Sequence, residues 1–391
     1  MDTVSEATSR STPCWLRFRH ALAGIYEVET GSQRLKALEG VRGLAVTLVF
    51  LFHYHEAFSV YLPADSVPLA LSGYVARLGY YGVDLFFALS GFLIYGAIIR
   101  QRRSYLGFVG RRLQRIYPTF LVVLCLYLVL SVAFPTRSRL PADGLWTYIL
   151  QNVLLLPGVW RIRPVIGVAW SLSYEMVFYV TLPLIVAALA LRAWWPGARI
   201  ALALALAVVV LVSGPADSAL GQFLMFVPGI VLCEVVFATR PSVALSTTGE
   251  WIAAAVFLTT FPAAVILEAA HLPEGMSGSL PGWRAVLRLL IVGGGFFLML
   301  LFAVGRSGPI ARVFSWAPLR WVGNVSYSYY LIHGLTLNGV ALVLLGVCPP
   351  DLPRLGLFLV MLPVAYALTI LTSTGLFLLV ERPFSIRSRG A

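Results

Sequence analysis

Charged residues and cysteines are scarce in this chain of 391 residues. Only 12% of the residues are charged, whereas 59% are hydrophobic, and the mean hydropathy is +0.85. A soluble protein of this length cannot hide so much apolar surface, so the composition predicts a chain that faces lipid. The four cysteines show no paired or metal-like spacing, and we expect neither a disulfide nor a bound metal. Walker and Rossmann glycine motifs are also absent, so nothing indicates ATP-driven transport.

Lysine is almost missing too, since Lys36 is the only one, and arginine supplies nearly all of the net charge of +12. A basic chain can bind nucleic acid, but here the arginines stand beside apolar segments. Membrane topology and lipid headgroups explain arginines in such places, so we expect a lipid bilayer and no nucleic acid as partner.

Long apolar runs dominate what is present. Ten of them approach the length needed to cross a bilayer, and they lie around 41–60, 80–99, 117–134, 169–191, 198–214, 219–238, 250–270, 285–305, 325–347 and 355–380. The apolar stretch 145–158 is too short and suits an interfacial or re-entrant piece. We therefore predict an all-α polytopic membrane protein with about ten transmembrane helices.

The arginine distribution orients these predicted helices. With the N-terminus inside, the cytoplasmic segments hold 20 of the 29 basic residues, so the positive-inside rule places both termini in the cytoplasm. Residues 1–37 lack an apolar core and are predicted to be a polar cytoplasmic tail, and 386–391 a second, short one. The loop 135–168 violates the rule, because it carries four arginines on the outside: Arg137, Arg139, Arg161 and Arg163.

The first apolar run, "LEGVRGLAVTLVFLFHYHEAF" (38–58), carries charge that a membrane helix disfavours. Arg42 and His53 are eleven residues apart, which on a helix leaves them about 20° apart around the axis and about 16 Å apart along it. His55 points to nearly the opposite side, and we expect it to be an interfacial residue. Glu56 is three residues beyond His53 and within reach of it. The spacing thus pairs His53, not His55, with Arg42.

Other polar residues interrupt the later apolar runs. Asp84 lies close to the predicted start of the second span, where it either caps the helix or is functional, and Ser90 lies near its middle. Glu175 stands in the fourth span and needs a partner, for which a histidine or arginine of another helix is the natural candidate. Glu234 is expected to be a boundary residue.

Two further groups complete the inventory. Ser326, Tyr330 and His333 share one helical face at offsets of four and three. Arg112 and Arg115 are one turn apart on the cytoplasmic side, where they either clamp phosphates or only set topology. Histidine with a carboxylate partner acts as a general base toward a hydroxyl, and arginines suit a phosphate-bearing donor. A proton-coupled transporter carries the same inventory, so the residues alone leave both classes open.

Six stretches, in order along residues 35–385, resemble motifs of the acyltransferase-3 family of integral membrane acyltransferases. They read "LEGVRGLAVTLVFLFH", "GVDLFFALSGFLI", "RRLQRIYP", "WSLSYEMVFY", "VGNVSYSYYLIH" and "VERPFS". The resemblance implies that 38–385 is one transmembrane acyltransferase domain. It also implies a bacterial, multi-pass enzyme of the inner membrane. Unlike some members of the family, the chain is expected to have no extracellular esterase-like domain after the tenth span.

The resemblance further implies the reaction. An acyl group, commonly acetyl, passes from cytoplasmic acyl-CoA, as co-substrate and not bound cofactor, to a hydroxyl of a surface or exported polysaccharide or glycolipid. The alternatives are a small macrolide-like metabolite as acceptor, or a transporter or flippase of glycan precursors. Arg42 and His53 would be the catalytic pair. Arg42 would orient the donor or stabilise charge on the carbonyl oxygen, and His53 would either deprotonate the acceptor hydroxyl directly or relay the acyl group. Arg112 and Arg115 would bind acyl-CoA, and the supporting polar site would comprise Asp84, Ser90, Glu175, Tyr327, Tyr330 and His333.

Overall fold

The computed structural model describes residues 14–27, 33–102, 104–138, 140–160, 162–213, 219–238, 247–269, 286, 289–304, 308–349 and 354–386, and these form helices joined by short connections, with no β-strand among them. Six helical stretches of this part are long and apolar enough to cross a membrane: Lys36–Tyr61, Val67–Arg100, Tyr105–Ala133, Gly167–Ala188, Ser326–Val347 and Leu355–Ser385. The predicted all-α membrane architecture is confirmed.

The remaining predicted spans correspond to other helices. Shorter apolar helices lie at Pro196–Val212, Phe223–Ala238 and Leu289–Val304, and the stretch around 250–270 falls on α10 (Thr247–Ala269). The stretch 145–158 contains only the nine-residue helix α5 (Leu145–Val153), too short to cross a bilayer. Of the four loop arginines, Arg139 and Arg161 lie outside the described residues, and Arg137 and Arg163 are exposed.

Two helices begin earlier than the apolar runs suggest. Helix α3 (Val67–Arg100) begins after Ser66, whose hydroxyl accepts a hydrogen bond from the Leu69 amide. Asp84 therefore lies in the middle of α3, and the expectation that it stands near a helix start is wrong. Helix α4 (Tyr105–Ala133) is capped in the same way by Ser104 and contains Pro118 in its interior, not at its start. Polar capping residues fix these starts, which apolar runs alone miss.

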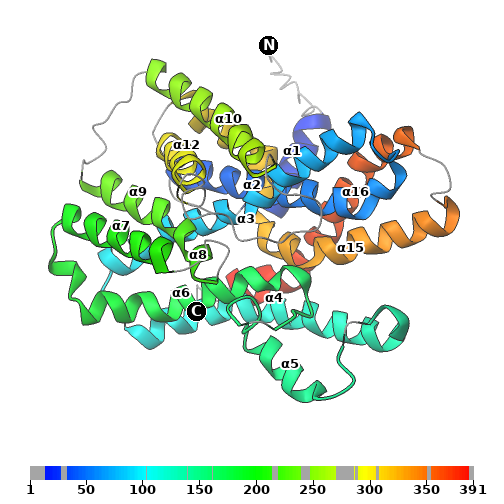
Figure 1. Ribbon diagram of the computed structural model, residues 1–391, viewed down its shortest axis with the longest axis horizontal. Coiled ribbons are helices and arrows are strands. Elements are labelled where there is room, and N and C mark those ends of the chain that lie inside the picture. The colour runs from blue at the N-terminus through cyan, green and yellow to red at the C-terminus, as the bar shows by residue number, and fades with distance from the viewer. Residues whose placement is uncertain are drawn as a thin grey trace, which may run out of the picture.

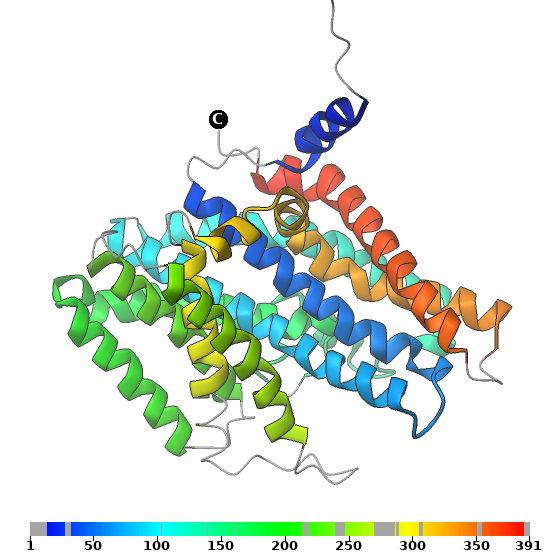
Figure 2. The same ribbon diagram turned by 90° about the horizontal axis from the view of Figure 1, so that it is seen from above.

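Helix α2 (Gln33–Phe58) runs through the middle of the molecule and packs most extensively against α3 (Figure 2). Gly79 and Gly82 allow this contact, because a Cβ atom on either would lie within 2.4 Å of a backbone oxygen of α2. Small residues let membrane helices approach closely in this way. On one side lie α15 (Ser326–Val347) and α16 (Leu355–Leu376), and toward the opposite edge lie α7 (Pro196–Ser213) and α9 (Val227–Ala238) (Figure 1).

The N-terminal segment contains a helix that the sequence analysis did not predict. Helix α1 (Cys14–Tyr26) lies beside the C-terminal part of the chain (Figure 2). Its last residue, Tyr26, hydrogen-bonds the hydroxyl of Thr374 at 2.8 Å and stacks on Trp321. Arg382 donates to the carbonyl oxygens of Gly24 and Ile25, the last turn of α1. Long-range contacts therefore hold this helix, and local apolar periodicity gives no sign of them.

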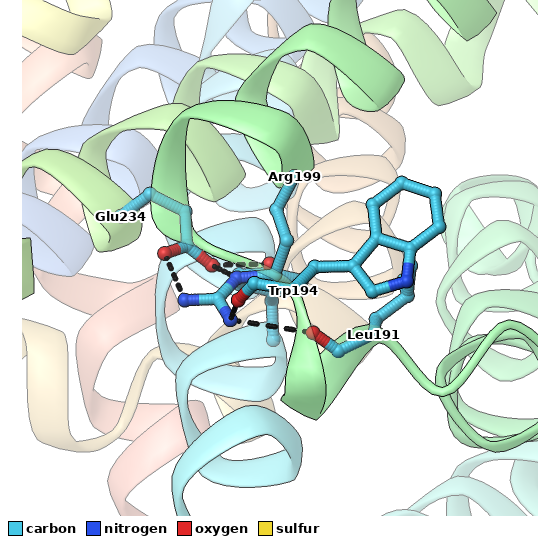
Figure 3. A network of polar contacts seen from close by, with 5 residues as sticks. Leu191, Trp194, Arg199 and Glu234 are labelled. Carbon is cyan, nitrogen blue, oxygen red and sulfur yellow. Dashed lines mark hydrogen bonds and ion pairs between the residues drawn. The ribbon is translucent and has the colours of Figure 1, made fainter.

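A buried ion pair ties α7 to α9 (Figure 3). The guanidinium of Arg199 donates to both carboxylate oxygens of Glu234, at 2.7 and 2.8 Å, and to the backbone oxygens of Leu191 and Trp194. The hydroxyl of Tyr95 on α3 donates to the same carboxylate. Glu234 is thus a buried, fully paired anion joining three helices, which corrects its interpretation as a simple boundary residue.

Candidate active site

A cavity of about 920 Å³ lies among α2, α3, α4, α6 (Trp170–Ala188) and α15. Seven of the ten residues that the sequence analysis assigned to the site line it: Arg42, Ser90, Arg112, Arg115, Glu175, Tyr327 and Tyr330. They come from segments up to about 290 positions apart, so the fold, not local sequence, assembles this site. The other three, His53, Asp84 and His333, are not among the lining residues.

One side of the cavity is strongly basic. Arg111, Arg112 and Arg115 line it from the first turns of α4, near the end that the positive-inside rule assigns to the cytoplasm. The Arg112 guanidinium lies 5.4 Å from the ring centre of Phe108 and 5.6 Å from that of Tyr179. Aromatic faces attract such cations and hold them in place. Three guanidinium groups in one wall form a surface suited to an anionic group such as a phosphate.

Glu175 introduces a negative charge into the cavity. Its two carboxylate oxygens each accept a hydrogen bond of 2.8 Å, one from Ser90 on α3 and one from Tyr179 on its own helix. These hydrogen-bond partners are hydroxyl groups, whereas an arginine of another helix, Arg42 on α2, interacts with Glu175 through its charge. Tyr179 was not anticipated, although its spacing of four from Glu175 is a helical contact that a sequence can reveal.

Arg42 is half-buried and lines the cavity from α2. The charges of Arg115, Glu175 and Glu381 act on it. Glu381 is buried, does not line the cavity, and accepts hydrogen bonds from the amide and hydroxyl of Ser328, at 3.1 and 2.5 Å. The motif "VERPFS" contained this residue, yet nothing in its local sequence shows that it lies near Arg42.

Two hydroxyl groups that line the cavity, those of Ser171 and Tyr330, are hydrogen-bonded to each other. Tyr330 on α15 donates to the carbonyl of Val168 at 3.0 Å, and its oxygen lies 2.7 Å from the hydroxyl of Ser171. The Tyr330 ring is also 6.1 Å from the rings of both Phe86 and His333. Tyr330 is therefore fixed by hydrogen bonds on one side, and its ring lies near His333 on the other.

His53 and Glu56 form a pair outside the cavity. The Nδ1 atom of His53 is 2.7 Å from a carboxylate oxygen of Glu56, as the spacing of three predicted. Side-chain exposures of 28% for His53 and 54% for Glu56 leave the pair reachable from outside the helix bundle. His55 instead bonds the hydroxyl of Ser72 on α3 at 3.0 Å. The two histidines thus face different neighbours, as the helical-face argument expected.

His333 is fully buried beside His53, with 5.1 Å between the ring centres. Its Nδ1 atom lies 3.0 and 2.9 Å from the carbonyl oxygens of Tyr329 and Tyr330. Carbonyl oxygens only accept hydrogen bonds, so Nδ1 carries the hydrogen and Nε2 presents its lone pair. That Nε2 atom has no hydrogen-bond partner among the described residues.

Arg42 and His53, which were predicted to share one face of a helix, thus occupy two different environments. Arg42 lies in the cavity with the basic residues, and His53 lies three turns away with Glu56. Two residues of α15 connect them: Tyr330 lines the cavity, and His333 lies beside both Tyr330 and His53. Asp84 is a buried residue of α3 and does not line the cavity.

Comparison with known proteins gives this arrangement a family. The model of the family described as acyltransferase domain matches residues 35–378. The chain is 29% identical to acyltransferase MdmB of Streptomyces mycarofaciens, over 78% of this chain and 79% of that protein. It is 24% identical to the peptidoglycan O-acetyltransferase OatA of Listeria monocytogenes and to the O-acetyltransferase OatA of Staphylococcus aureus.

Those two OatA alignments cover 76% of this chain, but this chain spans only about half of each OatA protein, 48% and 50%. No solved structure matches the chain. The family model covers most of the chain and the relatives are acyltransferases, so the transporter alternative loses its support. The chain belongs to the acyltransferase-3 family and is an O-acyltransferase of the membrane.

Proposed function

We propose that this enzyme transfers an acetyl group from cytoplasmic acetyl-CoA to a hydroxyl of a cell-surface or exported polysaccharide or glycolipid, in the inner membrane. The observation that carries the proposal is an arginine-lined cavity whose wall residue Tyr330 is linked, through the ring of His333, to a histidine–carboxylate pair. The cavity would receive the donor, and the exposed side of His53 would receive the acceptor.

The donor assignment is supported by the charge and volume of the cavity. Arg111, Arg112 and Arg115 present planar guanidinium groups, which bind phosphate oxygens with two parallel hydrogen bonds. Apolar residues such as Leu93 and Ile94 line the cavity beside them and suit the uncharged arm of a coenzyme A thioester. Arg42 lies three turns from His53, a position that favours orienting the donor over stabilising charge at the reacting carbonyl.

The base assignment rests on the tautomer of His53. An ionised Glu56 only accepts hydrogen bonds, so Nδ1 of His53 carries a hydrogen and Nε2 is left as the proton acceptor. In the reaction, the acceptor hydroxyl oxygen bonds to the thioester carbonyl carbon while Nε2 takes its proton. The carbon–sulfur bond then breaks, and the coenzyme A thiolate leaves and takes up a proton.

The acceptor class is supported by the relatives. The name of the Listeria relative states that it O-acetylates peptidoglycan, a surface glycan. A small-molecule hydroxyl is the second candidate. MdmB, which the chain matches over 79% of its length, is named only as an acyltransferase, and its name specifies no glycan acceptor. The match to OatA, whose name does specify one, covers only about half of that enzyme.

Membranes containing the enzyme, incubated with acetyl-CoA labelled in the acetyl group, test the proposal. We expect release of free coenzyme A and transfer of label to the polysaccharide or lipid-linked glycan fraction. Label found only in a solvent-extractable small molecule would assign the second acceptor class. Membranes that release no more coenzyme A than membranes without the enzyme would contradict the donor assignment.

A further inference from the structure

Among the hydroxyl groups that line the cavity, one has no hydrogen-bond partner within the part of the chain that the structure describes. Six hydroxyl-bearing residues line it, and five of them have hydrogen-bond partners within the protein: Ser90, Ser171, Tyr179, Tyr327 and Tyr330. Ser326 is the exception. Its side-chain oxygen is buried and has no partner among the described residues.

Ser326 occupies the first position of α15 and lines the same cavity as Arg42 and Arg115. The residue is only 1% exposed. A buried hydroxyl without a partner costs free energy, and nearly all such groups in folded proteins find one. An unused hydroxyl in the wall of a ligand-sized cavity is therefore explained if the ligand supplies the acceptor atom.

We propose that Ser326 is a substrate-binding residue whose hydroxyl donates a hydrogen bond to a carbonyl oxygen of the acyl donor. This inference rests on the proposed function, because it takes the occupant of the cavity to be a coenzyme A thioester. Such a donor has carbonyl oxygens that accept hydrogen bonds in two places, the amides of its pantetheine arm and the thioester itself. The basic wall holds its phosphates, and Ser326 fixes the uncharged part.

Ser326→Ala tests the inference, and Ser173→Ala is the matched control. Ser173 on α6 is also a buried serine whose hydroxyl has no partner among the described residues, but it does not line the cavity. Neither substitution should lower the melting temperature of the purified enzyme, since each removes an unpaired buried hydroxyl. Ser326→Cys, which keeps a weak donor of similar size, provides a second variant.

Binding of coenzyme A and of acetyl-CoA to each purified variant is measured by calorimetry, together with kcat and KM. We expect Ser326→Ala to weaken acetyl-CoA binding about twofold to tenfold, the range of one neutral hydrogen bond, with Ser326→Cys intermediate and Ser173→Ala unchanged. An equal loss for coenzyme A assigns the contact to a pantetheine amide. A loss of kcat with unchanged coenzyme A binding assigns it to the thioester.

Wild-type affinity in Ser326→Ala, or an equal loss in Ser173→Ala, would overturn the role of Ser326. A wild-type enzyme that binds neither coenzyme A nor acetyl-CoA would instead overturn the proposed function, and the inference with it. The two failures are thus distinguished by the wild-type titration alone.

Discussion

Glu56 holds His53 by its Nδ1 atom, at 2.7 Å, on the outer part of α2. The contact joins residues three apart on one helix, so it needs no tertiary structure to form. It fixes which nitrogen of the imidazole is free to take a proton, and His333 packs against the same ring from α15. The pair is therefore the part of the site where the proposed proton transfer begins.

Replacing Glu56 by Gln should lower kcat while changing the KM for acetyl-CoA little. The amide keeps the shape of the side chain but no longer favours the tautomer with a free Nε2, nor stabilises the imidazolium that forms. Initial rates at varied acetyl-CoA concentration check this. Glu27→Gln is the control, because Glu27 is similarly exposed, at 48%, but lies at the end of α1 beside Arg320. Equal kcat values for Glu56→Gln and the wild type would contradict the role of Glu56.

Arg112→Gln and Arg115→Gln should each raise the KM for acetyl-CoA. A hydrogen bond to a charged group contributes about 1.5–3 kcal/mol, so we expect roughly a tenfold to hundredfold increase. Arg100→Gln serves as the control, since Arg100 lies over the ring of Phe237 and does not line the cavity. If the KM for acetyl-CoA of Arg112→Gln and Arg115→Gln were no higher than that of Arg100→Gln, the arginines of α4 would set membrane topology and would not bind the donor.

The pair of Arg199 and Glu234 should matter for stability and not for chemistry. Arg199→Ala leaves a buried carboxylate without its partner, which typically costs about 3–5 kcal/mol. A fall in melting temperature in detergent, with an unchanged KM for acetyl-CoA in the folded fraction, is the expected result. The double variant Arg199→Met with Glu234→Leu should recover much of the loss. An unaltered melting temperature in Arg199→Ala would show that the ion pair does not hold α7 to α9.

Much of the fold follows from the sequence, because apolar length and arginine placement depend on the bilayer more than on tertiary contacts. The six helical stretches that are long and apolar enough to cross a membrane lie where apolar runs predict them. Helix starts differ, as at Val67 and Tyr105, because capping serines and not hydropathy set them. Helix α1 escapes prediction because its partners, Thr374 and Trp321, are far away in the chain.

The candidate site likewise combines contacts that the sequence can predict with contacts that it cannot. Contacts within one helix, such as His53 with Glu56, are visible as spacings of three or four. Contacts between helices are not: Ser90 with Glu175 and Ser171 with Tyr330 join residues 85 and 159 positions apart. For the same reason, spacing placed Arg42 and His53 on one face of a helix but could not show that only Arg42 lines the cavity, since other helices form most of its wall.

The role of His53 is the central claim, and acetyl transfer by the His53→Ala variant tests it most directly. Membranes with equal amounts of wild type, His53→Ala and His55→Ala are incubated with labelled acetyl-CoA, and coenzyme A release and label transfer are counted. Loss of a general base is expected to reduce the rate by about 10²–10⁴-fold, with expression and membrane insertion intact. His55→Ala should retain most of the activity, because His55 faces Ser72. Full activity in His53→Ala, or equal losses in both variants, would contradict the account.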